Sequence, residues 1–453
     1  MDKDLLEKFL SSFEYDKRLA EFDIEACITW IKLLVKNKVV KKQEAQKVLK
    51  ALEELKRNPK LLVEAEDIHY AVEETLEKLL KEDKKLAGII RTARSRNDLV
   101  VSDERSYIKK EIKEIKKLLK ELILSITNVA EKHLNTAMVG YTHLQPAQPV
   151  LFSHYILSFS WWFVRDIERL NDCYKRVDVS SLGSAAFAGS SFPIDRKDVA
   201  RQLKFSKVSF NSVDSVSDRD FIAEFIFCCS TISMHLSRIA EELIIWCNPN
   251  FGYISLPKQL TSGSSIMPQK QNPDYLELIR GKTSKVYSDL LGILVLLKAL
   301  PLSYNRDMQE DKVYLFSCVD ITESCIQVMK LVFDNLKVNK EKLTEDLLKY
   351  DFVLATEVAN FLVENLGYQY KLAHATTQRL LQYCVENKKK LINLSYEDYK
   401  KFLNELDEKT FRLLKTKLQP LSLASSYKTF GGSSLKQVKY QIKEIRNIIR
   451  KEL

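Results

Sequence analysis

A short stretch at residues 261–280, TSGSSIMPQKQNPDYLELIR, gathers side chains that can hold an anion and move a proton. Two adjacent serines, Ser264 and Ser265, follow a glycine, and Lys270 supplies a cation a few residues later. The Asn-Pro-Asp sequence at 272–274 predicts a helix start, because Asn caps helices, Pro is favoured at the first helical position and Asp complements the helix dipole. A serine-bearing loop that leads into a helix N-terminus is suited to binding an anion.

A histidine in another loop is the second candidate for proton transfer. His143 follows Thr142 in a segment bounded by Gly and Pro. Three other histidines fall in helical patterns, where a core or surface position is expected: His133, His154 and His235. Gly, Ser, Pro and His collect in four loops, at residues 138–149, 181–195, 248–272 and 301–312. Functional residues concentrate in loops held by a rigid scaffold, so we expect the site there.

The eight cysteines form no recognisable metal or disulfide pattern. The sequence has no Cys-x-x-Cys and no paired histidine spacing, and several cysteines lie within apolar runs. This pattern predicts buried free thiols in a reducing compartment. We expect neither a metal ion nor a cofactor at the site.

Charge and hydropathy limit the range of partners. The chain of 453 residues carries a formal net charge of +10, but most lysines fall on helix faces opposite the apolar positions. We therefore expect a solvated helix surface and no nucleic-acid partner. No signal peptide opens the chain, and the most apolar run, residues 150–164, is too short to span a membrane. These features predict a cytoplasmic protein without a membrane partner.

Long helices are predicted to carry these loops. Between residues 100 and 134, apolar residues recur at spacings of 4, 3, 4, 3, 4 and 3, which is a heptad seam: Ile108, Ile112, Ile115, Leu119, Leu122, Ile126 and Val129. Four more long helices are expected at about 150–178, 218–247, 273–299 and 311–336. Shorter helices are expected near the N-terminus, at 2–13, 16–37, 42–57 and 67–81.

The predicted fold is all-α, with three helical units. We expect an N-terminal helical domain at 1–98, a central bundle of five long helices with the functional loops at 99–345, and a C-terminal helical domain at 346–453. The long helix at 218–247 is apolar nearly all round, and a bundle of five helices has too little interior to hide such faces. We therefore expect other subunits to cover them, in a multi-subunit helical core.

Six segments resemble, in the same order, those of the argininosuccinate lyases of the fumarase/aspartase superfamily: TARSRNDLV, GYTHLQPAQPV, LGSAAFAGSSFPIDR, NSVDSVSDRDF, TSGSSIMPQKQNPDYLELIRGK and LSYNRDMQEDK. The GSSIMPQKQNP segment alone would identify only the superfamily, whose members release fumarate from a succinyl group. The six segments together are specific, and the resemblance covers nearly the whole chain.

The resemblance implies a carbon–nitrogen lyase that converts argininosuccinate to arginine and fumarate, in arginine biosynthesis. A base removes a proton beside a carboxylate, an aci-carboxylate carbanion forms, and the C–N bond to the guanidinium group breaks. One alternative is another fumarate-releasing lyase, such as adenylosuccinate lyase or an aspartase-like enzyme. A second is an inactive, crystallin-like structural protein, which stays open because the family's Trp-Gly-Gly-Arg-Phe stretch near the N-terminus is absent.

The resemblance also implies the catalytic residues: Ser264, His143, Lys270, Asn272 and Glu277. Ser264 matches the family's catalytic serine, a base whose alkoxide Lys270 and the helix N-terminus can stabilise; Ser265 is its adjacent rival. Lys270 and Asn272 are assigned to the developing aci-carboxylate. Glu277 pairs with His143 in the family and raises the basicity of its imidazole. Whether His143 relays a proton or protonates the leaving nitrogen is left open.

A second group matches family residues that contact the substrate: Ser12, Ser95, Arg96, Asn97, Thr142, Tyr304, Gln309 and Lys312. Residues 95–97 would hold a succinyl carboxylate, because guanidinium forks and amides suit carboxylates. Arg94, Arg219 and Asp67 could equally build ion-pair networks. In the family, three subunits each contribute one loop to every active site of a homotetramer, so we expect a homotetramer with shared sites.

Overall fold

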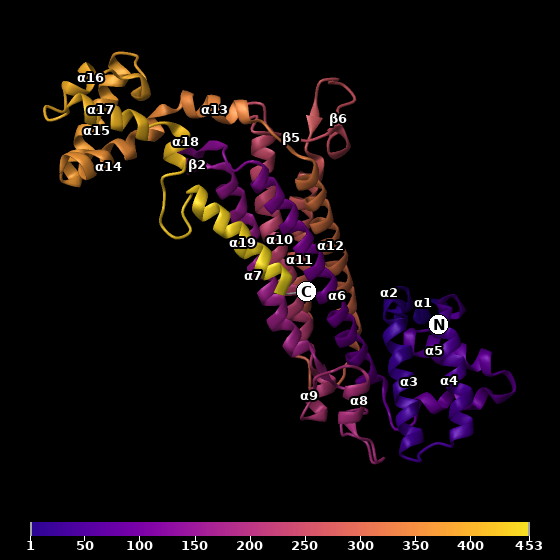
Figure 1. The fold of residues 1–453 in the computed structure, drawn as a ribbon. Coiled ribbons are helices and arrows are strands. Elements are labelled where there is room, and N and C mark those ends of the chain that lie inside the picture. The colour runs from indigo at the N-terminus through magenta and orange to yellow at the C-terminus, as the bar shows by residue number, and fades with distance from the viewer. Residues whose placement is uncertain (1, 452–453) are drawn as a thin grey trace. The chain divides into compact units, whose positions relative to one another are not determined.

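Short helices form the N-terminal part of the protein, drawn in indigo in Figure 1. The computed structural model describes residues 2–451. The helices of this part are α1 (Lys3–Leu10), α2 (Phe13–Asp16), α3 (Ala20–Lys36), α4 (Lys42–Arg57) and α5 (Ile68–Leu80). Helix α4 has the predicted bounds, whereas a short 3-10 helix at Lys17–Leu19 delays the start of α3. Helices α3, α4 and α5 pack against one another.

The five predicted long helices are confirmed. They are α6 (Arg96–Lys132), α7 (Phe152–Val177), α10 (Asp220–Cys247), α11 (Asp274–Leu297) and α12 (Asp311–Asn335). The heptad seam of α6 is buried along its whole length, from Ile108 at 0% exposure to Val129 at 8%. The all-α prediction is therefore correct, and it follows from the period of the apolar residues.

Helix α10 is largely buried within its own chain. Residues on several of its faces, such as Ile222, Phe225 and Leu236, are fully buried within one copy. By length and composition α10 could span a membrane, but 61% of its most apolar window lies inside the protein, as in the core helix of a soluble protein. Two large apolar residues of α10 stay exposed, Phe227 at 50% and Met234 at 36%. The expectation that other subunits cover this helix therefore stays a prediction.

Helix α11 carries a larger number of exposed apolar side chains. Six of its large apolar residues are exposed: Tyr275, Leu278, Tyr287, Leu291, Leu294 and Val295.

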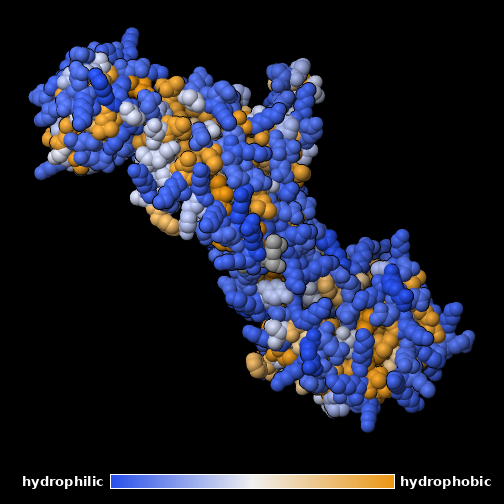
Figure 2. Space-filling model, viewed as in Figure 1, coloured by the Kyte–Doolittle hydropathy of each residue, from blue (hydrophilic) through white to orange (hydrophobic). Residues whose placement is uncertain are grey.

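On the face of the molecule drawn in Figure 2, hydrophilic residues predominate and hydrophobic residues form smaller groups between them. The hydrophilic cover agrees with the predicted solvated helix surface.

The strands are short and pair two by two. Three antiparallel ladders join β1 (Ala137–Thr142) with β2 (Gln145–Leu151), β5 (Ile254–Ser255) with β8 (Lys337–Val338), and β6 (Ser262–Gly263) with β7 (Gln271–Asn272). A parallel ladder joins β3 (Val179–Ser180) with β4 (Lys207–Val208). The β1–β2 and β6–β7 ladders lie largely within the predicted loops at 138–149 and 248–272, so they give fixed backbone geometry to segments that the hydrophobic pattern leaves undefined.

The remaining helices are short. Helices α8 (Arg196–Gln202) and α9 (Ser212–Ser217) follow β3, and the C-terminal part contains α13 (Lys340–Lys349), α14 (Ala355–Leu366), α15 (Tyr370–Glu386), α16 (Tyr396–Lys400), α17 (Glu408–Lys417), α18 (Pro420–Ala424) and α19 (Leu435–Lys451). Helices α14 and α15 pack against each other, and α17 packs against α14 and α18.

The chain divides into two units, and the boundaries fall inside all five long helices. Unit 1 comprises residues up to Leu118, Asp166–Met234 and Gly281–Cys325. Unit 2 comprises Leu119–Arg165, His235–Arg280 and the residues from Ile326 onward. The predicted domains 1–98, 99–345 and 346–453 stay a prediction, and their outermost residues, 1 and 452–453, lie outside the described part of the chain.

Candidate active site

His143 lies at the tip of the β1–β2 hairpin in unit 2. Thr142 pairs with Gln145, which leaves His143 and Leu144 as a two-residue turn with φ values of 55° and 56°. Two-residue hairpin turns of type I′ need positive φ at both central residues, which costs of the order of 1–3 kcal/mol for each non-glycine residue. The side chain of His143 is exposed. The turn therefore holds the imidazole out into solvent at a backbone position that is strained.

A buried tyrosine pair supports this hairpin. The hydroxyl of Tyr141 on β1 lies 2.7 Å from the hydroxyl of Tyr253, whose side chain is fully buried. Burial raises the pKa of Tyr253, and the bond to Tyr141 adds to the shift. Gly140 allows the strands to approach, because a Cβ there would lie 2.9 Å from the carbonyl oxygen of Gln148. These contacts fix the strand that leads to Thr142 and His143.

The serine loop is a second hairpin in unit 2. Strands β6 and β7 pair Ser262 with Asn272 and close a loop that contains both candidate serines. The Ser264 hydroxyl oxygen accepts hydrogen bonds from the backbone N–H groups of Ile266 (3.3 Å) and Met267 (3.1 Å). Donors aimed at a hydroxyl oxygen stabilise its deprotonated form. This environment distinguishes Ser264 from Ser265, whose side chain is exposed.

The helix after this loop starts one residue later than the Asn-Pro-Asp sequence predicts. Pro273, and not Asn272, provides the carbonyl that accepts the first helical bonds, from the N–H groups of Leu276 (2.9 Å) and Glu277 (3.2 Å). Asn272 is instead part of β7, because its backbone pairs with Ser262. The Ser262 hydroxyl donates to the carboxylate of Asp274 at the start of α11. Asn272 thus closes the loop that carries Ser264.

The structure does not join His143 to Glu277 within one chain. Among residues 2–451, no hydrogen bond or ion pair links the two side chains. Glu277 lies exposed in the first turn of α11, and Lys270 is exposed in the serine loop. The predicted His143–Glu277 pair stays a prediction that needs a second copy of the chain or a closed loop.

Residues 95–97 form the start of α6 in unit 1. The buried Asp98 carboxylate accepts hydrogen bonds from the backbone N–H groups of Ser95 (3.1 Å), Gly183 (2.8 Å) and Ala185 (2.9 Å). Burial raises the pKa of Asp98 to about 6, although Arg94 and these N–H groups lower it. The side chain of Asn97 donates to the carbonyl of Ala186 (3.0 Å). Asp98 thus ties the glycine- and serine-rich loop after β3 to residues 95–97.

Arg96 is held by two acids and an aromatic ring. Its guanidinium lies 2.7 Å from the carboxylate of Asp67 and 3.6 Å from that of Glu66. The ring of Tyr70 lies 4.6 Å from the guanidinium carbon, in cation–π contact. Glu66 also binds Arg306 at 2.6 Å. The prediction that Asp67 could belong to an ion-pair network is confirmed, and the network positions Arg96.

Ser12 has a buried acidic partner that sequence reasoning missed. The Ser12 hydroxyl donates to the Asp16 carboxylate at 2.6 Å, and the other oxygen of Asp16 accepts from the N–H of Ile68 at 3.1 Å. Ser12 and Asp16 are each 2% exposed. Burial raises the pKa of Asp16, although the bond from Ser12 lowers it. The spacing of four residues within a helical segment was the available signal for this pair.

Lys312 belongs to a fully buried charge network. Its ammonium donates to Glu104 (3.0 Å) and Asp311 (2.8 Å), and Arg219 donates to Asp311 (2.7 Å). The side chains of Arg219, Glu104 and Asp311 are 0% exposed, and that of Lys312 is 5% exposed. Arg219 therefore lies in the ion-pair network that the sequence left open. The role of Lys312 in substrate binding stays a prediction.

Two other predicted substrate contacts lie in the same unit. The Gln309 amide donates to the carbonyl of Leu10 at 3.2 Å, and Arg306 donates to the same carbonyl at 2.9 Å. Burial raises the pKa of the Tyr304 hydroxyl, while the positive charge of Lys312 lowers it. Within unit 1 the segment around Leu10 is thus tied to the loop that carries Tyr304 and Gln309.

The predicted residues therefore separate into two groups. Unit 1 holds Ser12, Ser95, Arg96, Asn97, Tyr304, Gln309 and Lys312, and unit 2 holds Thr142, His143, Ser264, Lys270, Asn272 and Glu277. Apart from Thr142, the residues assigned to substrate binding lie in unit 1 and those assigned to proton transfer in unit 2. The first group provides cations and amides for carboxylates. The second provides a hydroxyl, an imidazole and an ammonium group for acid–base chemistry.

Comparison with known proteins assigns the chain to a family. The family model described as "Lyase" matches residues 2–288, and that of the "Argininosuccinate lyase C-terminal" region matches residues 352–418. The argininosuccinate lyase of Syntrophus aciditrophicus (strain SB) is 42% identical over 452 residues, which cover 98% of this chain and 93% of that protein.

Two further comparisons agree with this assignment. The argininosuccinate lyase of Caldicellulosiruptor bescii is 41% identical over 452 residues, covering 99% of this chain and 96% of that protein. A crystal structure of an EDDS lyase in complex with formate shares the fold with a TM-score of 0.83 at 22% identity, over 96% of this chain and 87% of that one. The chain belongs to the argininosuccinate lyase family and is a lyase.

Proposed function

We propose that this protein catalyses the reversible elimination of fumarate from L-argininosuccinate to give L-arginine. The observation that carries the proposal is the near-full-length identity of about 40% to relatives named argininosuccinate lyase. The structure supports it with two groups of side chains whose chemistry matches the two demands of the reaction. These demands are to bind several carboxylates and to move a proton away from carbon.

In the proposed mechanism Ser264 is the base. Its oxygen already accepts two backbone N–H groups, which would stabilise an alkoxide, and Lys270 adds a positive charge when the loop closes over substrate. The base takes the proton beside a carboxylate, and Lys270 and Asn272 stabilise the aci-carboxylate carbanion. His143 then delivers a proton to the leaving guanidinium nitrogen, either directly or as a relay. Glu277 raises the basicity of the His143 imidazole.

Unit 1 would hold the ends of the substrate. Arg96, fixed by Asp67, presents a guanidinium fork to a succinyl carboxylate, with Ser95 and Asn97 beside it. Asp16 provides a buried carboxylate beside Ser12, which would suit a cationic part of the arginine moiety. Binding energy from these distant groups can be used to orient the reacting carbon.

The active protein would be a cytoplasmic homotetramer with active sites shared between subunits. The exposed apolar side chains of α11 support an interface along that helix, because exposed patches of this kind mark protein–protein contacts. His143 and Glu277 are exposed and have no side-chain partner within residues 2–451, which also supports completion of the site by another copy. No metal ion or cofactor takes part in the proposed reaction.

The function is tested by incubating the pure protein with argininosuccinate and following the absorbance of fumarate. We expect fumarate release with argininosuccinate and none with adenylosuccinate or aspartate. Release from one of the other two substrates alone would establish the alternative lyases. No release from any of them under saturating conditions would establish the inactive structural protein.

Sharing of the site is tested by mixing two inactive variants. Ser264→Ala removes a group from unit 2 and Arg96→Ala removes one from unit 1, so each homo-oligomer should be inactive. Co-refolded mixtures should regain activity well above the sum of the two, because some sites combine an intact loop from each variant. If mixed oligomers form but stay inactive, the two groups must come from one chain.

A further inference from the structure

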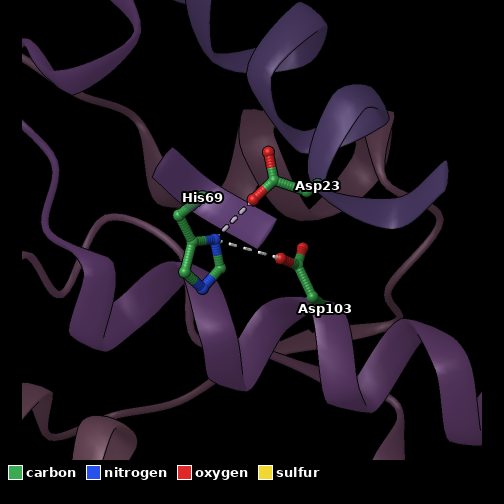
Figure 3. A group of neighbouring side chains, drawn as sticks. All are labelled: Asp23, His69 and Asp103. Carbon is green, nitrogen blue, oxygen red and sulfur yellow. Dashed lines mark hydrogen bonds and ion pairs between the residues drawn. The ribbon is translucent and has the colours of Figure 1, made fainter. Parts of the chain in front are cut away.

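Three side chains from different helices of unit 1 converge outside the residues assigned to the reaction. They are Asp23 on α3, His69 on α5 and Asp103 on α6. Figure 3 shows both carboxylates directed at the same ring nitrogen of His69. Its Nδ1 lies 2.5 Å from a carboxylate oxygen of Asp23 and 4.0 Å from one of Asp103. The side chains of Asp23 and Asp103 are 1% exposed, and that of His69 is 12% exposed.

Asp103 is the unexplained member of this group. Among residues 2–451, neither of its carboxylate oxygens has a hydrogen-bond partner, although both are buried. Burial raises the pKa of Asp103 well above its usual value, and the negative charge of Asp23 raises it further. An unpaired carboxylate in the interior is costly, so a native protein normally supplies a counter-charge.

The surrounding side chains do not supply that counter-charge by contact. The positive charge of Arg94 lowers the pKa of Asp103, but its guanidinium donates to the sulfur of Cys27 at 3.2 Å. The other terminal nitrogen of Arg94 is buried without a hydrogen-bond partner in the described chain. Glu104, the next carboxylate, already binds Lys312 and Arg219. The cluster therefore has more acid than its contacts neutralise.

The geometry of the cluster suits a small divalent cation. One oxygen of each carboxylate and Nδ1 of His69 all lie within 4.8 Å of one another. Ligand bonds of about 2.1 Å would place two ligands of a tetrahedral ion about 3.4 Å apart. The separation of 4.0 Å to Asp103 would need to close slightly, and the 2.5 Å contact to Asp23 would need to open. Side-chain torsions suffice for both changes.

We propose that Asp23, His69 and Asp103 bind one divalent transition-metal ion, with water completing the coordination. An imidazole nitrogen with two carboxylate oxygens suits Zn²⁺ or Mn²⁺ better than Mg²⁺ or Ca²⁺, which prefer oxygen ligands alone. The ion would neutralise Asp103 and replace the proton shared by Asp23 and His69.

The ion would have a structural role. It would join α3, α5 and α6, and the first turn of α5 begins beside Asp67, which holds Arg96. Occupancy would therefore stiffen the segment that presents Arg96 without taking part in proton transfer. The proposal is independent of the proposed reaction, because metal binding is measured without substrate.

The test uses the full-length protein after dialysis against a chelator. Zn²⁺ and Mn²⁺ are titrated separately by calorimetry, and bound Mn²⁺ is counted by electron paramagnetic resonance. We expect one ion for each chain and a metal-induced rise in the unfolding temperature. Asp103→Asn, which keeps the shape of the side chain, should weaken binding at least about tenfold. His69→Gln is the second variant if Asp103→Asn does not fold.

Glu111→Gln is the matched control, since it removes a carboxylate from the same helix outside the cluster. Its affinity and stoichiometry should equal those of the unchanged protein. The proposal is overturned if neither ion binds stoichiometrically, which would mean that protons alone neutralise the cluster. It is also overturned if a folded Asp103→Asn or His69→Gln variant binds as tightly as the control.

Discussion

The two groups of predicted site residues are held in opposite ways. In unit 1, Arg96 and Lys312 each contact two acids, and Ser12 donates to a buried carboxylate. In unit 2, the side chains of His143, Lys270 and Glu277 have no hydrogen-bond or ion-pair partner among residues 2–451. The residues predicted to bind substrate are thus positioned by contacts within one chain, whereas these three residues predicted to transfer protons are not.

The difference follows from the energetics of charge. A buried cation needs a counter-charge, so Lys312 and Arg219 form ion pairs with Glu104 and Asp311. These ion pairs restrict the motion of the side chains. An exposed ammonium or imidazole is solvated by water and needs no partner, so it can change its contacts at little cost. In general, preorganised groups suit substrate binding, and groups that can change their contacts suit catalysis after a loop closes.

The largest effect is expected at the serine loop. Ser264→Ala should reduce kcat about 10³-fold, because general-base catalysis typically contributes 10²- to 10⁴-fold, while the oligomer is unchanged. Ser265→Ala is the matched control and should retain most of the activity. Fumarate absorbance and light scattering measure the two properties. A greater loss in Ser265→Ala than in Ser264→Ala would reverse the assignment of the base.

The next effect concerns the buried network of unit 1. Asp311→Asn leaves Arg219 and Lys312 with one carboxylate and should lower the free energy of unfolding by about 3–5 kcal/mol. Asp320→Asn on the same helix breaks an exposed pair with Arg18 and should cost about 0–1 kcal/mol. Thermal or urea unfolding compares them. Equal costs for the two variants would mean that burial does not make this network rigid.

A smaller effect is expected at the support of the His143 hairpin. Tyr253→Phe removes the hydroxyl that meets Tyr141 and should cost about 1 kcal/mol of stability. If the same loss of about 1 kcal/mol also destabilises the transition state, kcat falls about fivefold with little change in KM. Tyr368→Phe, which breaks an exposed bond to Glu405, should leave kcat unchanged. An unaltered kcat in Tyr253→Phe would show that the hairpin needs no such support.

The smallest effect is a pH dependence within unit 1. Burial and, to a lesser extent, the neighbouring Glu323 carboxylate together raise the pKa of Glu111 to about 7. A pKa raised by folding gives stability that is complete at low pH and is lost as the pH rises through about 7. Glu111→Gln should therefore be about 1 kcal/mol more stable than the unchanged protein at pH 8 and equal to it near pH 4. Glu114→Gln, whose carboxylate meets Lys117 in solvent, should show no such difference.

The sequence predicted the fold well because the fold depends on periodicity. The apolar spacing of Ile108 to Val129 defined α6, and comparable runs defined the other four long helices. Sequence reasoning expected other subunits to cover α10, and the structure shows more exposed apolar residues on α11 than on α10. The sequence did not single out α11, since hydrophobicity reports the tendency to be buried but not which neighbour covers a face.

The local sequence identified candidate residues of the site but not the partners that position them. The residue types in the loops identified Ser264, His143 and Lys270 as candidates, since hydroxyl, imidazole and ammonium groups are suited to proton transfer. The pairing of Ser12 with Asp16, the acids around Arg96 and the Asp23–His69–Asp103 cluster were not predicted. These partners lie on different elements, and no local pattern encodes their approach.

The sequence by itself determined the helical architecture and the chemical types available in its loops, because periodicity and side-chain chemistry are local properties. Only the tertiary structure decided which of those groups are paired and which remain free. Pairing depends on burial and on distances between segments far apart in the sequence, such as Glu104 and Lys312, 208 residues apart, and Leu10 and Gln309, 299 residues apart. The segment 261–280 illustrates both points. The local sequence identifies Ser264 as a candidate, whereas the fold of the loop places the two backbone N–H groups that donate to its hydroxyl oxygen.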